Sequence, residues 1–344
     1  MIEEARPSIH DGITKKNALG SIVLIEATPS ANLDPLSTAL TTIKLRAYLN
    51  VALDAGGSWA IDFPAYEGFT LNVVQKGECW LSIAGSTDPL RLRTGDCFLL
   101  TGGKNFTLAT NLQLRKRFRA ERLFTNAQGG LAVCNGGGDF FVAGPIFRFD
   151  GHLPSILFSR LPPVIFIDGG SDQAAVLRWS LDRFSAEMRG GSVGQSLMLT
   201  HLAPIMLLQV LRLYLSSSPK DENWLVALSN PALCRVVDAM QNAYGKEWSL
   251  DRFAKLANMS RSGLALTFRK KIGVAPMVYL MNWRMQIACE LLKKGEQSIA
   301  SIAAVVGYAS ESAFSSAFYK LVQCRPGAYR KAICTDKSSR FADL

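Results

Sequence analysis

The strongest constraint on this chain of 344 residues is an internal repeat in its last third. Phe253-Ala254 returns 49 residues later as Ile302-Ala303, and each copy is followed by a serine, a large apolar residue and a phenylalanine at matching intervals. Those following residues are displaced by 50 and pair as Ser260 with Ser310, Leu264 with Phe314, and Phe268 with Phe318. A repeat at a fixed spacing predicts two copies of one supersecondary unit.

The second copy, Ser298 to Leu321, has the pattern of a helix-turn-helix. Ile299, Ile302, Ala303 and Val306 share one helical face, and Gly307 ends that helix because glycine adopts the left-handed conformation freely. Ser310 predicts the cap of a second helix with an apolar face of Phe314, Ala317, Phe318 and Leu321. Such a unit places its second helix in the DNA major groove. One copy alone would be a weak signal, but two copies predict a DNA-reading module.

The distribution of charge favours the same function. The net charge is +10, and residues 230–344 hold 17 Lys and Arg against 8 Asp and Glu. The first 229 residues hold 21 against 20, so nearly all the positive excess lies with the repeat, as attraction to phosphate requires.

The rest of the chain divides by pattern. We expect an extension at 1–33, a helix over Pro35–Ala47, a strand-rich sensor domain at 34–170, a helical region at 171–222, the DNA-binding domain at 230–331 and a tail at 332–344. Within the extension, Ile22–Ile25 could add a strand. Short alternating runs separated by glycine predict a β-sandwich or barrel. The expected strands are Tyr48–Leu53, Ser58–Phe63, Thr70–Val74, Cys79–Ala84, Leu90–Leu92 and Cys97–Leu100.

Two amphipathic helices are expected at Asp172–Met188 and from Val193 to Leu215. They either form a dimer interface or pack on the barrel, and the sequence favours neither. The stretch from Leu197 to Leu215 is long enough to span a bilayer. It contains polar residues and lacks a flanking basic cluster, so we expect a soluble, cytoplasmic protein without a membrane partner.

Three other patterns predict little chemistry. The glycines around Cys134 indicate a flexible connection. The basic run Arg115–Arg119 could contact nucleic acid, but its pattern favours a solvated strand or loop paired with Glu121. Seven cysteines without C-x-x-C spacing favour reduced thiols over a zinc site. The three histidines, His10, His152 and His201, lie outside the strand-rich stretch 48–110, so we expect no metal, no cofactor and no catalytic residues.

Two stretches resemble known families. Gly77–Leu81 and Leu90–Leu100 resemble the cupin-type sensor domain that precedes certain DNA-binding regulators, although Lys104-Asn105-Phe106 stand where a cupin enzyme has a histidine. Residues 230–331 closely resemble the DNA-binding domain of AraC-type bacterial transcription regulators. The matching motifs are Met259–Phe268, Pro276–Leu292, Ile299–Phe318 and Pro326–Arg330. The resemblance implies a multidomain α+β fold: an N-terminal cupin-like β-barrel, then an all-α domain with two helix-turn-helix motifs joined by a linker helix.

The resemblance also implies which residues meet DNA. The first recognition helix would run from Ser260 to about Ile272. The expected base-reading residues are Arg261, Ser262, Ala265 and Leu266 in the first recognition helix and Glu311, Ser312, Ser315 and Ser316 in the second. The expected phosphate contacts are Arg269, Lys270, Lys271, Arg325, Arg330 and Lys331. Leu266 and Ser316 replace arginines common in the family, and Gln323 replaces a common glycine.

We therefore expect a sequence-specific regulator that reads a bipartite site in two successive major grooves. Its expected partners are double-stranded DNA, RNA polymerase, an unknown small-molecule effector and a second copy of the chain. We take an activator as the expectation, although the sequence does not distinguish an activator from a repressor. One alternative is a ligand-independent DNA-binding protein whose barrel serves assembly. The other is a cupin-type enzyme, against which the lack of barrel histidines argues.

Overall fold

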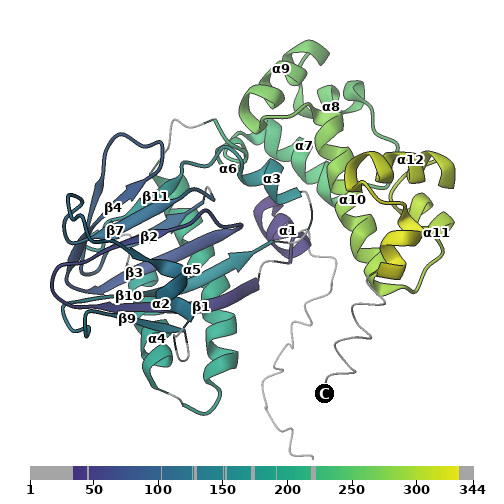
Figure 1. Ribbon diagram of the computed structural model, residues 1–344. Coiled ribbons are helices and arrows are strands. Elements are labelled where there is room, and N and C mark those ends of the chain that lie inside the picture. The colour runs from purple at the N-terminus through teal and green to yellow at the C-terminus, as the bar shows by residue number, and fades with distance from the viewer. Residues whose placement is uncertain are drawn as a thin grey trace, which may run out of the picture. The chain divides into compact units, whose positions relative to one another are not determined.

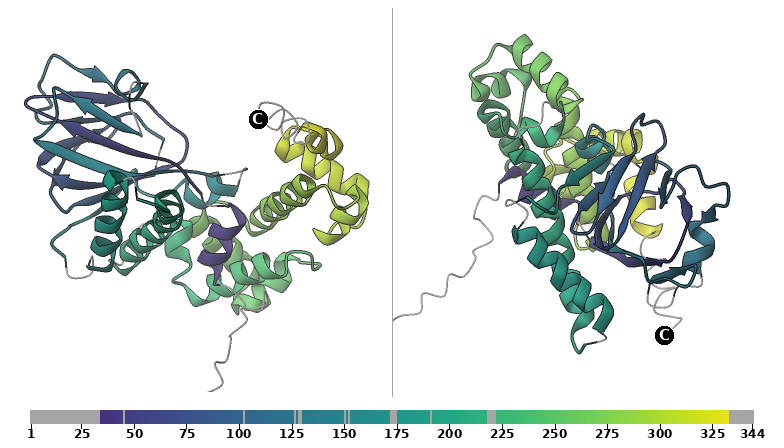
Figure 2. Two further views of the ribbon diagram at one scale, coloured as in Figure 1. Left: turned by 90° about the horizontal axis from the view of Figure 1, so that it is seen from below. Right: turned by 90° about the vertical axis from the view of Figure 1, so that its left-hand side faces the viewer.

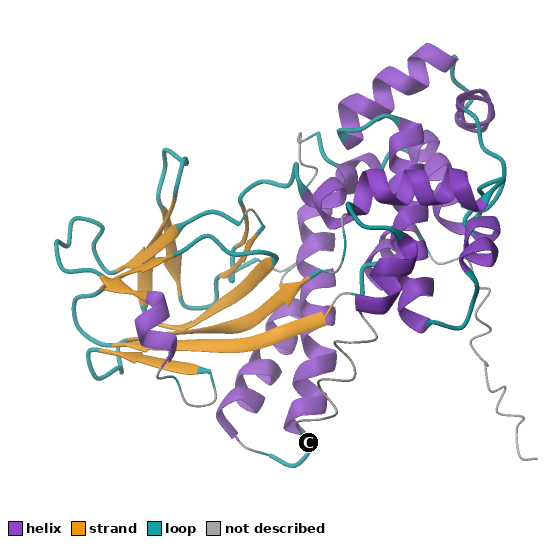
Figure 3. Ribbon diagram, turned by 45° about the vertical axis from the view of Figure 1, so that its right-hand side comes forward, coloured by secondary structure: helices purple, strands orange, loops and turns teal. Residues whose placement is uncertain are grey.

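The computed structural model describes residues 34–44, 46–101, 103–125, 127, 130–149, 151, 153–171, 175–190, 192–217 and 222–332. The strand expected at Ile22–Ile25, two of the histidines (His10 and His152) and the tail beyond residue 332 lie outside these ranges. Figure 3 shows the strands gathered in the N-terminal part of the described chain and helices throughout the C-terminal part.

The N-terminal domain holds two sheets. One has six strands in the order β11-β6-β3-β10-β1-β9, and the other has five in the order β5-β4-β7-β2-β8 (Figure 1). The strands are β1 (Arg46–Ala55), β2 (Ala60–Phe63), β3 (Phe69–Lys76), β4 (Glu78–Ile83), β5 (Leu90–Arg93), β6 (Cys97–Leu100), β7 (Phe106–Ala109), β8 (Phe118–Arg119), β9 (Leu131–Cys134), β10 (Phe140–Arg148) and β11 (Val164–Ile167). Side chains from both sheets form one apolar cluster, as a closed or nearly closed barrel requires.

All six expected strands are present, as β1 to β6. The other five strands, β7 to β11, were not predicted. The most central of them, β10, contains Gly144 and Pro145, which break the usual strand pattern. Gly144 is needed because a Cβ there would lie 1.8 Å from the carbonyl oxygen of Leu71 on the neighbouring strand. The expected helix over Pro35–Ala47 is shorter than predicted: α1 covers Pro35–Thr42, and β1 already begins at Arg46.

The glycine-rich segment around Cys134 is not a loose connection. Cys134 ends β9, which pairs in parallel with β1. The following glycines turn around a carboxylate, and the backbone N–H of Gly138 donates to Asp54 Oδ1 at 2.7 Å. A Cβ at Gly137 would lie 2.7 Å from the same carboxyl group, so this turn depends on a glycine there.

Two short helices, α2 (Ala120–Thr125) and α3 (Leu153–Phe158), interrupt the strands. The helices α4 (Ala175–Gly190) and α5 (Gln195–Ser216) then form an antiparallel hairpin, and they run side by side in both views of Figure 2. Alternate residues of β3 and β6, such as Leu71 and Leu99, pack against this hairpin, while Val74 and Phe98 face the barrel interior. The hairpin therefore packs on the six-stranded sheet through its inner side.

The C-terminal domain is helical. Its elements are α6 (Trp224–Ala227), α7 (Pro231–Asn242), α8 (Leu250–Ala257), α9 (Arg261–Ile272), α10 (Pro276–Lys294), α11 (Ile299–Val305) and α12 (Glu311–Val322). Asn230 caps α7, and its side chain accepts hydrogen bonds from two backbone N–H groups of the first turn. The linker helix α10 begins at Pro276 as expected and runs two residues beyond Leu292.

The apolar clusters do not follow the domain boundaries. One cluster runs from the sheet and the α4–α5 hairpin through Phe158 and Trp224 into α7, α8, α9 and the first half of α10. A separate cluster joins the second half of α10 to α11 and α12. The first helix-turn-helix therefore shares its core with the sensor domain, and the second has a core of its own.

Candidate DNA-binding surface

The two repeats are built with the same helix caps. Ser260 caps α9 by accepting from the N–H of Gly263, and Ser310 caps α12 by accepting from the N–H of Ala313, 50 residues later. The first helices of the two units are capped in the same way by Ser249 (α8) and Ser298 (α11). A serine side chain satisfies a backbone donor that the helix leaves free, so each serine fixes where its helix begins.

The turn inside each unit is also repeated. Asn258 and Gly307, 49 residues apart, both adopt the left-handed conformation, with φ of 54° and 80°. In each turn the next residue donates back to the helix: Met259 to the carbonyl of Ala254 at 3.0 Å, and Tyr308 to that of Ala303 at 2.9 Å. This is the Schellman arrangement that ends a helix and redirects the chain, and it sets the angle of the recognition helix.

The recognition helices α9 and α12 have matching exposure along their length. In α9, Arg261, Ser262 and Leu266 are exposed and Ala265 is half-buried, while Leu264 and Phe268 are buried. In α12, Glu311, Ser312 and Ser316 are exposed, Ser315 is half-buried, and Phe314 and Phe318 are buried. Six of the eight expected base-reading residues are thus exposed, and the other two, Ala265 and Ser315, are half-buried at corresponding positions of the two helices.

The two outward surfaces differ in chemistry. Leu266 is 72% exposed, which is unusual for a leucine and suits contact with thymine methyl groups. The corresponding residue of α12 is Ser316, and its neighbours on the outward side of this helix, Ser312 and Ser315, also carry hydroxyl groups. Arg261 lies 3.8 Å from Asp251 of α8, but both side chains are largely exposed, so this ion pair leaves the guanidinium accessible.

The six expected phosphate contacts differ in their exposure and in their hydrogen-bond partners. Arg269, Lys270 and Lys331 are exposed, Arg325 is exposed beside α12, and Lys271 is half-buried. Lys270 forms an ion pair at 3.3 Å with Glu222, just before α6. Arg330 is half-buried and donates to the carbonyl of Gln297 at 2.7 Å, which gives it a structural role in the second unit.

A groove of about 810 Å³ lies along α12. Its lining brings together the predicted readers Ser312, Ser315 and Ser316 with the predicted phosphate contacts Arg325 and Lys331. Tyr319 also lines it and is 53% exposed, although it was not predicted as a site residue. The repeat could have identified it, since Tyr319 occupies the position that Arg269 has in α9.

Arg284 of α10 joins the two units. Its guanidinium donates to the carbonyls of Tyr244 (2.9 Å) and Lys246 (2.8 Å) and lies over the ring of Tyr308 at 5.7 Å. Desolvation lowers the pKa of Arg284, and the nearby Tyr308 acts in the opposite direction. Gly307 lies against this guanidinium, so closely that a Cβ at this position would be 2.7 Å from Nη2.

The barrel encloses a cavity of about 220 Å³. Its lining is mainly apolar, with polar atoms only from the backbone and from Tyr66, Thr70 and Asn72. Burial raises the pKa of Tyr66 to about 12, and its hydroxyl donates to the carbonyl of Leu100 at 3.3 Å. No charged side chain lines this cavity, so it suits a neutral ligand.

The barrel residues that could carry other chemistry have structural partners. At the expected histidine position, Asn105 accepts from the N–H of Ala65, and Phe106 stacks on Phe63 with ring centres 4.4 Å apart. Within the described ranges, no group of three or more His, Cys, Asp and Glu side chains is arranged to hold a metal ion. Burial raises the pKa of Cys79 and of Cys97, which keeps both thiols protonated.

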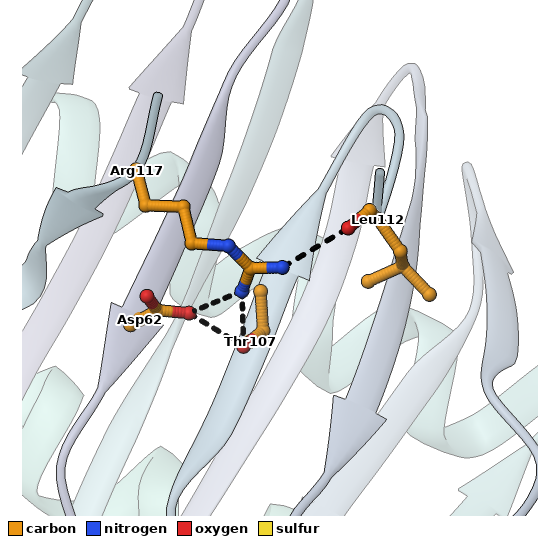
Figure 4. Close-up of polar contacts among 4 residues, drawn as sticks. All are labelled: Asp62, Thr107, Leu112 and Arg117. Carbon is orange, nitrogen blue, oxygen red and sulfur yellow. Dashed lines mark hydrogen bonds and ion pairs between the residues drawn. The ribbon is translucent and has the colours of Figure 1, made fainter. Parts of the chain in front are cut away.

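The basic run at residues 115–119 has a different partner from the one expected. Arg117 donates to Asp62 at 2.9 Å and to the carbonyl of Leu112 at 3.0 Å, and the hydroxyl of Thr107 donates to the same carboxylate at 2.7 Å (Figure 4). The predicted partner Glu121 forms no ion pair with this run in the described structure. Arg117 therefore holds the edge of the five-stranded sheet.

A cupin-like barrel followed by two capped helix-turn-helix units defines a DNA-binding regulator. Residues 34–216 match the cupin family and residues 253–332 match a helix-turn-helix domain. The chain is 35% identical over 300 residues to an AraC-like transcription regulator of Streptomyces antibioticus, covering 87% of this chain and 99% of that protein. It is 25% identical to the HTH-type transcriptional regulator MtrA of Neisseria gonorrhoeae, covering 87% and 98%.

Among solved structures, an AraC-type transcriptional regulator from Chromobacterium violaceum is 28% identical, with a TM-score of 0.29 over 30% of this chain and 94% of that chain. The chain belongs to the AraC family of transcription regulators, with a cupin domain at its N-terminus. Its class of function is DNA binding in the control of transcription.

Proposed function

We propose that the protein reads a bipartite DNA site with α9 and α12 in two successive major grooves, in response to an effector bound by the barrel. The observation that carries the proposal is the matching exposure of the two recognition helices, together with their shared serine caps. The linker helix α10, 19 residues long, spans about 28 Å at 1.5 Å per residue, which is close to the pitch of one DNA turn. In this proposal the protein acts in the cytoplasm as an activator that engages RNA polymerase, and not as an enzyme.

The test is footprinting of the purified full-length protein on DNA that flanks its own gene. We expect two protected segments about one helical turn apart. Arg261→Ala and Glu311→Ala should each weaken binding to that site about tenfold while binding to random DNA is unchanged, since base contacts specify and phosphate contacts do not. Arg93→Ala, an exposed change on the barrel strand β5, is the matched control. Equal losses on both DNAs would remove Arg261 and Glu311 from base reading.

The effector proposed for the barrel cavity is a small, neutral, largely apolar molecule with one or two hydrogen-bonding groups. The cavity is larger than the apolar cavity of about 150 Å³ known to hold benzene. We expect neutral aromatic alcohols to raise the melting temperature of the protein and carboxylates of the same size to leave it unchanged. Val142→Phe, which fills the cavity, should abolish the shift. Stabilisation by the carboxylates would contradict the assignment of a neutral ligand.

The outer side of the α4–α5 hairpin is our proposed dimer interface. Trp179 and Leu197 are each 65% exposed and Ile205 is 47% exposed, an apolar surface suited to a second copy of the chain. The helix Gln195–Ser216 is long and apolar enough to cross a bilayer by length and composition, but residues such as Met206 and Val210 are buried against the sensor domain. Sedimentation should show a dimer that Trp179→Glu converts to monomer; a monomeric wild-type chain would contradict this interface.

A further inference from the structure

The last turn of a recognition helix leaves backbone carbonyl groups without partners inside the helix. In the two repeats, the same carbonyl is satisfied in two different ways. The carbonyl of Lys320 in α12 accepts from Gln323 Nε2 at 3.0 Å, so this helix end is capped by the residue that follows it. The corresponding carbonyl in α9, that of Lys270, accepts from Arg160 Nη1 at 2.7 Å.

Arg160 belongs to the sensor domain and follows α3, 110 residues before the carbonyl that it caps. Gly273 leaves the space for it, because a Cβ at Gly273 would lie 3.0 Å from Arg160 Nε. The residue that corresponds to Gly273 in the second repeat is Gln323, which supplies its own cap. Gly273 caps the carbonyl of Arg269 through its backbone N–H, but the carbonyl of Lys270 has no local donor and receives one from the sensor domain.

The segment that carries Arg160 also borders the ligand-binding side of the barrel. A second cavity, of about 500 Å³, is lined by Phe158 and Leu161 of this segment and by Tyr66. Tyr66 also lines the barrel cavity, so this side chain borders both cavities. At the start of the segment, Gly151 lies against Gln286 of α10 so closely that a Cβ would be 2.1 Å from Oε1.

We propose that Arg160 is the positioning residue through which the sensor domain holds the first recognition helix. It acts at the end of α9, where Lys270 also forms an ion pair with Glu222, just before α6. The second recognition helix is capped by its own chain and does not depend on this contact. In this way the effector controls the first recognition helix, α9, and not the second, α12. This regulatory step rests on the proposed function, but the cap itself does not.

The cap is tested without DNA by hydrogen–deuterium exchange of the full-length protein. In Arg160→Ala, the amides in the last turn of α9 should exchange about three- to tenfold faster, because a hydrogen bond from a charged donor is lost. The last turn of α12 is the internal control and should be unchanged. Arg160→Lys should be intermediate, because it keeps the charge but loses the planar fork. Unchanged exchange in α9, or equal acceleration in α9 and α12, would overturn the proposal.

The double variant Arg160→Ala/Gly273→Gln distinguishes a contact with the sensor domain from simple capping of α9. Arg160→Ala removes the contact, and Gly273→Gln supplies a cap of the kind that Gln323 provides at the end of α12. We expect it to restore slow exchange in α9 while affinity for the footprinted DNA stays about threefold or more below that of the wild type, because the reader must be ordered on binding. The control DNA has its first half-site scrambled, and on it all variants should bind alike. Affinity restored together with slow exchange would reduce Arg160 to a local cap. Failure of the wild type to bind DNA would overturn the proposed function and leave the exchange result standing.

Discussion

The two helix-turn-helix units are nearly identical locally and differ in their surroundings. In both, a phenylalanine of the recognition helix meets a tyrosine edge-on: Phe268 with Tyr279 at 5.8 Å and Phe318 with Tyr329 at 5.6 Å. The first pair lies in the core that continues into the sensor domain, and the second lies in the separate cluster of α11 and α12. The same local sequence pattern thus forms two units with different surroundings. The first helix-turn-helix shares its core with the sensor domain, and the second is connected to the first through α10.

A buried polar network reinforces the first unit alone. The hydroxyl of Tyr279 accepts from Trp224 Nε1 at 3.2 Å and from Gln241 Nε2 at 3.0 Å. Next to it, Asn223 donates to the hydroxyl of Tyr214 at the end of α5, at 2.9 Å. Asn223 and Trp224, at the start of α6, are therefore fully buried, and they hydrogen-bond to Tyr214 of α5 and Tyr279 of α10, respectively. Such a network makes movement of the first unit costly unless the sensor domain moves with it.

The largest expected effect comes from truncating one buried phenylalanine in each of the two cores, at corresponding positions of the repeat. Phe268→Ala and Phe318→Ala each remove a fully buried ring, at a cost of about 3–5 kcal/mol. Phe268→Ala should lower the temperature of the main unfolding transition, because the core around Phe268 includes the sensor domain. Phe318→Ala should leave that transition in place and accelerate hydrogen exchange only in α11 and α12. Calorimetry combined with exchange measures both, and equal loss of the main transition in the two variants would show that the cores are not separate.

The next effect concerns the buried hydroxyl. Tyr279→Phe leaves two buried donors, Trp224 Nε1 and Gln241 Nε2, without their acceptor, which costs about 1–3 kcal/mol. The matched control is Tyr329→Phe in the second unit, where the half-buried hydroxyl meets the thiol of Cys289, and a smaller loss is expected. Chemical denaturation of the full-length variants gives the free energies of unfolding. A loss for Tyr329→Phe as large as for Tyr279→Phe would remove the network as the distinguishing feature.

How far the sequence predicts the structure depends on whether a feature is local. The cap Ser310 and the turn at Gly307 were predicted correctly, because each acts within a few residues of its own position. The strand β10 was missed because Gly144 and Pro145 break the usual strand pattern, and Gly144 is explained only by the neighbouring strand. The cap from Arg160 and the burial of Trp224 were missed for the same reason, since their partners lie 55 or more residues away.

Charge provides a further contrast, in the binding of DNA phosphate. The helix α9 carries four basic residues and no acidic residue, whereas α12 carries Lys320 and Glu311. Arg269→Gln should weaken binding to all DNA sequences and reduce the slope of log K against log salt by about 1. At the corresponding position of α12, Tyr319→Phe should leave the slope unchanged. Titration of binding at several salt concentrations checks this, and an unchanged slope in Arg269→Gln would remove that residue from the phosphate contacts.

The smallest expected effect is at the residue that ends α12. Gln323 adopts φ of 57°, a conformation that costs a non-glycine residue about 1 kcal/mol. Its side chain offsets this cost by capping Lys320, since a hydrogen bond of this kind contributes about 0.5–1.5 kcal/mol. Gln323→Gly removes both terms, so we expect a loss of no more than about 0.5 kcal/mol in the local stability of the second unit. The change should slightly accelerate exchange in α12 and leave α9 unaffected. If α9 responded equally, the two helix ends would be coupled, and the difference between a self-capped and a sensor-capped reader would not hold.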